Sequence, residues 1–287
     1  MVSGNQNITN ENIRSYYSDT SSDYWLAWLD GQNLSMHFGY EDDRTTDHSG
    51  SLTRAIEVLA DIAEVGPGDR VLDAGCGIGG SSLWLATARE SEVVGIALGA
   101  DQVDLARCEA KRRGRTIKAQ FAVADFRALP FSDCSFDVVW AQESLCHADH
   151  KARFFEEAAR VLVSTGRIVV SDFMLRRPLA NGENKRLLQE WFDGWALPGL
   201  WTAAQHANAA RAAGLRDVCI RDVTRHTLPS HRRLYRRVRW ITPVAKLLQI
   251  TGPRNSVQDG NIIASLRQYE TLRRDWWFYG ILAARKP

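Results

Sequence analysis

The sequence contains no uninterrupted run of about 18 apolar residues, so no membrane-spanning helix is expected. Its first residues, MVSGNQNITNENIR, are polar and hold no apolar segment typical of a secretory signal. An excess of one charge sign is also missing, because 36 basic and 34 acidic side chains leave a formal net charge of +2. This balance disfavours a nucleic-acid-binding protein, and a hydrophobic content of 45% excludes a disordered chain. We expect a globular, cytoplasmic protein without stable membrane insertion.

Patterns that bind metals or form disulfides are missing as well. The five cysteines are odd in number and scattered, and none belongs to a C-x-x-C pair. Neither a zinc site nor a disulfide framework is therefore indicated. No cluster of acidic residues suggests a divalent metal ion, and a metal-independent protein is expected. Tryptophan is the one residue type in excess, with ten copies.

A regular alternation of elements begins near residue 70. Helical segments, the clearest of them over 100–113 and 151–162, separate short apolar segments. The apolar segments are predicted to be strands and cover residues 71–74, 92–97, 117–123, 136–141 and 166–173. Strands that alternate with helices of this length are typical of a parallel, doubly wound α/β sheet.

The region before this core is rich in aromatic residues. Residues 1–65 are predicted to form a helical cap segment, whose first helix is capped by Asn10 and reaches Tyr17. Residues 66–287 are predicted to form the core. We expect a single large domain with this segment appended.

An insertion precedes the last predicted strand, which covers residues 275–285. It spans about residues 224–274 and is long enough to form a lid. Within it we expect a helix over 230–250 that is broken near Pro243, because proline lacks the backbone N–H of a helical hydrogen bond. A second helix is expected over 254–272.

A glycine-rich turn follows the first predicted strand. Gly75, Gly77 and Gly80 satisfy G-x-G-x-x-G, a pattern shared by several nucleotide-binding folds. Asp73, two residues before the first glycine, suits a cationic amino group and would sit badly against a pyrophosphate. A dinucleotide site also expects an acid at the end of the second strand, where this chain has none. An NAD-dependent oxidoreductase is therefore a remote alternative.

The whole segment resembles motif I of the class I S-adenosylmethionine (SAM)-dependent methyltransferases. The chain is most similar to their tocopherol-methyltransferase-like branch, through G-I-G-G-S-S at 77–82, G-I-x-L-x-x-x-Q at 95–102, and H-x-G-Y at 37–40. A histidine after the fourth strand and the final A-R-K-P segment also match. The resemblance implies a Rossmann-like doubly wound sheet with an antiparallel last strand, and SAM as the cofactor.

The resemblance also assigns cofactor-binding roles. Many class I enzymes carry an acid after strand two that binds the ribose hydroxyls, and this chain departs from that pattern. The implied positions are Gly75, Gly77 and Gly79 in the turn, Asp73 at the amino group, Leu98 and Gln102 at the ribose, Asp125 and Phe126 at the adenine, and Ala141 and Gln142 at the methionine end.

Catalytic candidates lie beside the cofactor. His147 follows the fourth strand, and a neutral imidazole there could take a proton from the acceptor. The alternative is a structural histidine that bonds the backbone. Tyr16 or Tyr17 is expected over SAM, because aromatic faces attract a sulfonium and any carbocation formed on an alkene.

Further aromatic residues are candidates for the acceptor pocket, although most aromatic side chains simply fill cores. The candidates are Tyr24, Phe173, Trp191 and Trp195. A basic run from Arg225 to Arg239 could receive a diphosphate or nucleic acid, but the solvated face of a helix is the favoured interpretation.

Some bacterial members of the resembled group, the teleocidin-type C-methyltransferases, methylate a prenyl chain on an indole scaffold. We therefore expect methyl transfer to a carbon of a lipophilic natural product, with formation of a cation and possible cyclisation. The alternative is an O- or N-methyltransferase of a phenol or an amine. The expected partner is a lipophilic small molecule rather than a nucleic acid, and a homo-oligomer is compatible with the sequence.

Overall fold

The protein is described by a computed structural model over residues 8–20, 33–178, 183–251 and 255–287. Its strands form one seven-stranded sheet in the order β3-β2-β1-β4-β5-β7-β6. The bounds are Arg70–Ala74 (β1), Glu92–Ala97 (β2), Ala119–Val123 (β3), Phe136–Gln142 (β4), Leu162–Leu175 (β5), Arg216–Asp222 (β6) and Trp277–Arg285 (β7).

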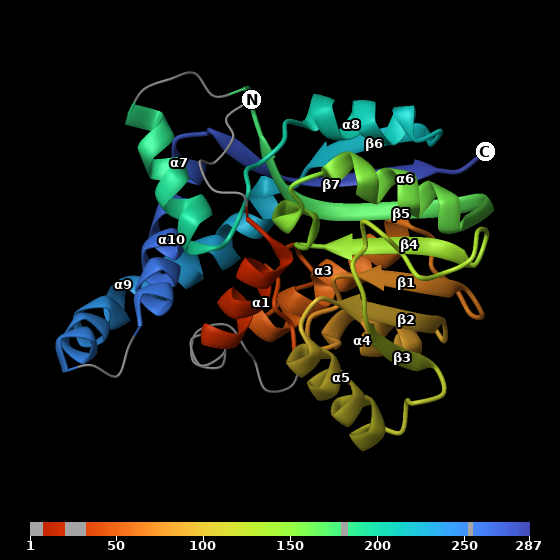
Figure 1. Ribbon diagram of the computed structural model, residues 1–287, viewed down its shortest axis with the longest axis horizontal. Helices are drawn as coiled ribbons and strands as arrows, with labels where there is room; N and C mark the ends of the chain where they lie inside the picture. Colours follow the sequence, from red (N-terminus) through yellow and green to blue (C-terminus); the bar gives the residue numbers. More distant parts are fainter. Residues whose placement is uncertain (1–7, 21–32, 179–182, 252–254) are drawn as a thin grey trace.

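The first five strands run parallel, and β7 runs antiparallel to both of its neighbours, β5 and β6. The chain order reverses at β1, which lies between β2 and β4. In such sheets ligands bind beyond the carboxyl ends of the strands at this reversal. The predicted doubly wound α/β fold with an antiparallel last strand is confirmed (Figure 1).

Two hydrophobic layers enclose the sheet. Alternate residues of a strand point to opposite faces, so Val71 joins one layer and Leu72 the other. Helices α3 (His48–Ile62), α4 (Gly80–Ala88) and α5 (Ala100–Arg112) contribute to the first layer. Helices α6 (Lys151–Val161) and α8 (Ala203–Ala212) contribute to the second.

Helix α1 spans Asn10–Asp19 and lies near the middle of the view in Figure 1. The prediction that Asn10 caps this helix is wrong. Thr9 is the N-cap, because its hydroxyl accepts from the Asn12 N–H while the Asn12 side chain accepts from the Thr9 N–H. Asn10 is the first helical residue, and its amide is free to make contacts elsewhere.

The helices α7 (Glu183–Gly194), α9 (Thr224–Thr251) and α10 (Ser256–Arg273) gather at one end of the sheet (Figure 1). The predicted break near Pro243 is wrong, because α9 runs through both Pro229 and Pro243. Each proline removes one hydrogen bond, but Leu234, Val238 and Ala245 are buried at helical spacing on either side of Pro243. Packing on the core thus holds both halves of the helix in place.

Candidate active site

The glycine turn between β1 and α4 has the backbone conformation that the sequence predicts. Gly75, Gly77 and Gly79 have φ values of 98°, 53° and 89°, in the left-handed region that favours glycine. At Gly75 space is also limiting, since an added Cβ would lie 2.2 Å from the Cβ of Ser144. The Ser144 hydroxyl donates to the carbonyl of Ala74 at 2.6 Å and keeps the end of β4 against the turn.

A cleft lies above this turn. It contains about 880 Å³ of empty space, open mouth included. The proposed site residues that line it are Tyr17, Asp73, Gly75, Gly77, Leu98, Gln102, Phe126, Gln142 and His147. The sequence thus predicts part of the lining, drawn from α1, the turn and the ends of β2, β3 and β4.

Other proposed residues lie outside this lining. Gly79 is the N-cap of α4, and Ala141 is buried within β4. Tyr24 lies outside the described residues. Tyr16 is buried, and its hydroxyl donates to Oδ1 of Asn261 on α10 at 3.0 Å. Tyr16 therefore contacts α10, whereas its neighbour Tyr17 faces the cleft.

Asp73 sits at the floor of the cleft and is 2% exposed. The Ser82 hydroxyl donates to its Oδ2 at 2.6 Å. Desolvation by burial raises the pKa of this carboxyl to about 6, although the Ser82 hydrogen bond opposes the shift. A cationic amino group placed against Asp73 would favour the charged form. The site thus fits the amino end of SAM.

Gln142 ends β4 and faces the same floor. Its Oε1 accepts from the Ser81 hydroxyl at 2.9 Å. Its Nε2 is buried and finds no acceptor in the described part of the chain. A buried amide without an acceptor is costly, so a ligand oxygen at this point would be stabilising. The methionine carboxylate of SAM is the group that suits this donor.

His147 and Tyr17 contact each other across the cleft. The Tyr17 hydroxyl lies 2.9 Å from His147 Nε2, and His147 Nδ1 lies 3.4 Å from the carbonyl of Ala196. Because a carbonyl only accepts, Nδ1 carries the proton and Nε2 accepts from Tyr17. Desolvation by burial lowers the pKa of His147 to about 4, so the imidazole is neutral at physiological pH.

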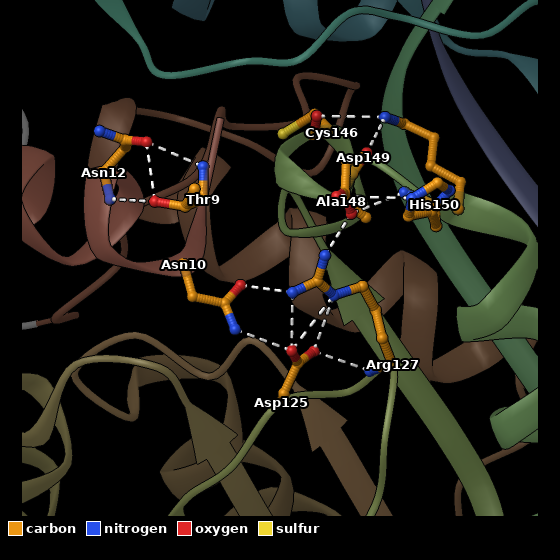
Figure 2. A network of polar contacts seen from close by, with 10 residues as sticks. Thr9, Asn10, Asn12, Asp125, Arg127, Cys146, Ala148, Asp149 and His150 are labelled. Atoms are coloured by element: carbon orange, nitrogen blue, oxygen red, sulfur yellow. Dashed lines mark hydrogen bonds and ion pairs between the residues drawn. The ribbon is translucent and has the colours of Figure 1, made fainter. Parts of the chain in front are cut away.

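Asp125 is already paired, as Figure 2 shows. Arg127 Nη2 donates to its Oδ2 at 2.8 Å, and Asn10 Nδ2 donates to the same oxygen at 2.9 Å. Arg127 also contacts the Asn10 side-chain oxygen and Asp149. Burial alone would raise the pKa of Asp125, but these hydrogen bonds outweigh it and hold the pKa below its usual value.

The network around Asp125 therefore joins three segments: the start of α1, the loop after β3 and the loop before α6 (Figure 2). The sequence marks Asp125 as an adenine contact but gives no sign of the two partners. The neighbouring Phe126 lines the cleft, as an adenine-stacking residue must.

The aromatic candidates Phe173, Trp191 and Trp195 form a packed cluster. They are 3%, 0% and 7% exposed, and none is among the residues that line the cleft. The ring centroids of Phe173 and Trp191 are 5.4 Å apart at 78°, an edge-to-face contact. Trp277 of β7 packs on both rings. In this structure the three side chains belong to the core.

Glu143 is a cleft residue that the sequence reasoning missed. It follows β4 with φ of 51°, and its Oε1 accepts from the Phe38 N–H at 2.7 Å and from the Tyr279 hydroxyl at 2.6 Å. Desolvation by burial raises its pKa to about 8 against these hydrogen bonds. An acid directly after β4, next to the predicted Gln142, is the signal that could have revealed it.

The described residues contain neither a candidate metal site nor a candidate membrane span. No group of three or more His, Cys, Asp or Glu side chains in them could hold a metal ion. None of the helices in those ranges combines the length and the hydropathy of a membrane span.

Comparison with known proteins agrees with this geometry. A family model for a methyltransferase domain matches residues 72–170, from β1 into β5. The 27-O-demethylrifamycin SV methyltransferase of Amycolatopsis mediterranei is 35% identical over 206 residues, covering 71% of this chain and 74% of that protein. The chloroplastic tocopherol O-methyltransferase of Arabidopsis thaliana is 31% identical over 237 residues. That alignment covers 76% of this chain and 66% of the plant protein, slightly under two thirds.

Among solved structures, the [4+2]-cyclase SpnF superposes with a TM-score of 0.79 at 26% identity and 97% coverage of both chains. The fold, the glycine turn and these relatives define a class I SAM-dependent methyltransferase. The chain belongs to this family, and within it to the small-molecule methyltransferases related to the tocopherol enzymes. Its cofactor is SAM.

Proposed function

We propose that this enzyme transfers the SAM methyl group to a carbon atom of a lipophilic natural product, a prenyl side chain on an indole scaffold. When bound, SAM would supply an electrophilic methyl group on a sulfonium. The acceptor carbon would attack this methyl group in line with its bond to sulfur, and that bond would break. Asp73 and Gln142 hold the methionine end, and the turn at Gly75 and Gly77 lets the backbone approach it. The protein thereby contributes proximity and orientation.

The observation that carries the choice of carbon is the neutral pair of His147 and Tyr17 in the cleft. A histidine with a pKa near 4 is a poor base for a phenol, whose pKa is about 10. The same histidine can accept a proton from a carbocation, because a carbocation is strongly acidic. When the two π electrons of an alkene form the new carbon–carbon bond, the neighbouring carbon becomes cationic and must lose a proton.

The chain's own groups would receive that proton and stabilise the cation. His147 Nε2 has the lone pair that would accept the proton. The Tyr17 hydroxyl donates a hydrogen bond to this lone pair and would have to shift as the acceptor arrives. The Tyr17 ring lines the cleft next to His147, and aromatic rings attract cations. Of the predicted 1–65 cap, we infer that α1 covers this site, since it brings Tyr17 to the cleft, whereas α3 packs in the core.

The second candidate is O-methylation, which the names of the two relatives above favour. The test is turnover with isotope-labelled SAM methyl followed by NMR of the product. A methyl signal coupled to carbon neighbours supports the proposal, and a methyl bound to oxygen or nitrogen overturns it.

His147→Ala tests the proton acceptor. Loss of a positioned base typically lowers the rate about 10²- to 10⁴-fold. With a carbon acceptor, the distribution of alkene products should change as well, because the cation loses different protons. A wild-type rate and product profile across pH would remove His147 from the mechanism.

A further inference from the structure

A second hollow lies between α9 and α10 and shares no lining residue with the SAM cleft. It contains about 1210 Å³ of empty space with a wide mouth. Four arginines and two tyrosines dominate its lining: Arg232, Arg236, Arg239, Arg273, Tyr235 and Tyr269. No acidic residue among those that the structure describes lines it.

The positive charge of this hollow is uncompensated within the described part of the chain. Helix α9 contains six arginines and one lysine in sequence, and no aspartate or glutamate. Arg236, Arg239 and Arg273 form no ion pair there, and Arg232 contacts only the Tyr269 hydroxyl, at 3.4 Å. By contrast, Arg267 on the same α10 pairs with Glu190 at 2.6 Å and Glu270 at 2.7 Å.

The arrangement of α9 is amphipathic. Arg232, Arg236, Arg239 and Pro243 recur at spacings of four, three and four, so they share one face of the helix. Leu234 and Val238 pack into the core on the other side. Trp240, which also lines the hollow beside the arginines, is 83% exposed. An exposed indole next to guanidinium groups is unusual on a surface that faces only water.

We propose that this face of α9, with Arg273 of α10, binds the surface of a membrane rich in anionic phospholipids. Phosphate groups of lipids would neutralise the arginines, and Trp240 would enter the boundary between headgroups and acyl chains. The choice of a membrane rests in part on the proposed function, because a lipophilic acceptor partitions into bilayers. Adsorption of this kind requires no membrane-spanning helix.

Other anionic ligands fit the surface less well. The lining arginines are exposed, so a small phosphate there would stay hydrated and bind weakly. A nucleic acid or an acidic protein would satisfy the arginines, but neither explains the exposed Trp240 beside them as directly as a bilayer does.

The test is co-sedimentation of the full-length chain with vesicles. Phosphatidylcholine vesicles with phosphatidylglycerol should retain the protein at low salt, and pure phosphatidylcholine vesicles or high salt should release it. The double variant Arg236→Ala/Arg239→Ala should bind about 25-fold more weakly, from about fivefold per arginine. The matched control Arg211→Ala/Arg216→Ala removes two exposed arginines on α8 and β6 and should change binding less than twofold.

Three results would overturn the proposal. The first is that the wild type does not bind anionic vesicles. The second is that Arg236→Ala/Arg239→Ala and the control Arg211→Ala/Arg216→Ala lose vesicle affinity equally. The third is calorimetric binding of inorganic diphosphate at Arg236 and Arg239 without vesicle binding. Calorimetric SAM binding should be unchanged in all variants, which shows that they fold. Vesicle binding needs no acceptor, so a failure of the carbon-methylation proposal would appear only in the product NMR.

Discussion

The two helical segments that contact each other beside the cleft, α1 and α10, are attached to the protein in opposite ways. Helix α1 buries only Ile13 and Tyr16, and it meets the core through the polar contacts of its inner face. Asn10 binds Asp125 and Arg127, Arg14 donates to the carbonyl of Leu98 at 3.0 Å, and Tyr17 reaches His147.

Helix α10, by contrast, buries eight residues and packs closely on α7, where Gly194 lies against Gly260. Polar contacts that can re-form with water are less costly to open than packed apolar surface. We therefore expect α1, rather than α10, to open for exchange of the cofactor. The 224–274 insertion, expected as a lid, is anchored in the core through α10.

The largest effect should follow from removing α1. Deletion of residues 1–20 takes away Tyr17 and uncovers the cleft, so turnover should fall by at least about 10²-fold. The unfolding temperature should change little, because few buried contacts are lost. Turnover assays and thermal unfolding of the truncated chain measure both. Retained activity would show that α1 is only a packing element.

Disturbing the contact between α7 and α10 should have the opposite outcome: stability should fall, and SAM binding should stay unchanged. In Gly194→Ala, the new Cβ would lie 2.2 Å from the Gly260 carbonyl oxygen and 2.7 Å from Ala264. Overpacking of this kind should cost about 3 kcal/mol in the free energy of unfolding, measured by denaturant titration. Gly66→Ala is the control, because its Cβ would meet nothing within 4 Å. SAM affinity of the folded variant should stay unchanged, and a loss of affinity would contradict the separation of the two segments.

A third experiment uses Glu143, which lines the cleft. Its folded-state pKa of about 8 lies above its ordinary value of 4.5, so the folded chain retains a proton that the unfolded chain loses. Its contribution to stability is therefore full below about pH 4.5 and is lost as pH rises through about 8.

Glu143→Gln keeps the shape and cannot ionise. At pH 8 and above it should be more stable than the wild type by on the order of 2 kcal/mol, and the difference should vanish near pH 5. Denaturant titrations at several pH values give the comparison. Parallel pH profiles of the two proteins would mean that Glu143 is ionised in the folded state.

The smallest effect is expected at the anchor of α1. Asn10→Ala removes the amide between Asp125 and Arg127, and should weaken SAM binding by about 1 kcal/mol, or roughly fivefold, with global stability unchanged. Glu11→Ala on the exposed side of the same helix is the control. An equal change in both variants would indicate a general effect on α1 instead of a specific anchor.

The cofactor side of this molecule was predictable because its function constrains the backbone. Gly75 and Gly77 need positive φ. Asp73 and Gln142 lie at the carboxyl ends of β1 and β4, two neighbouring parallel strands, so the pairing of these strands brings the two side chains together. Asp125 was predicted as a contact, but its partners Asn10 and Arg127 come from sequence-distant segments that periodicity cannot align.

The remaining side depends on tertiary packing. Trp191 and Trp195 look the same in sequence whether they fill a core or line a pocket, and the structure buries them. The helix continues through Pro243 because the burial of Leu234, Val238 and Ala245 outweighs the local preference of proline against a helix interior. Glu143 gains its importance from Tyr279, which lies 136 positions later.

The place of β7 in the sheet has a consequence for the order in which the protein matures during synthesis. Strand β7 comes last of the seven in sequence, yet it lies between β5 and β6. While a ribosome is still making residues 277–285, β6 has no strand to pair with and the edge of β5 is open. Glu143 also lacks the Tyr279 hydroxyl during that time. The hydrogen bond that Tyr279 donates to Glu143 in the cleft, and the connection of β6 to the rest of the sheet, can therefore form only after β7 has been made and has paired between β5 and β6.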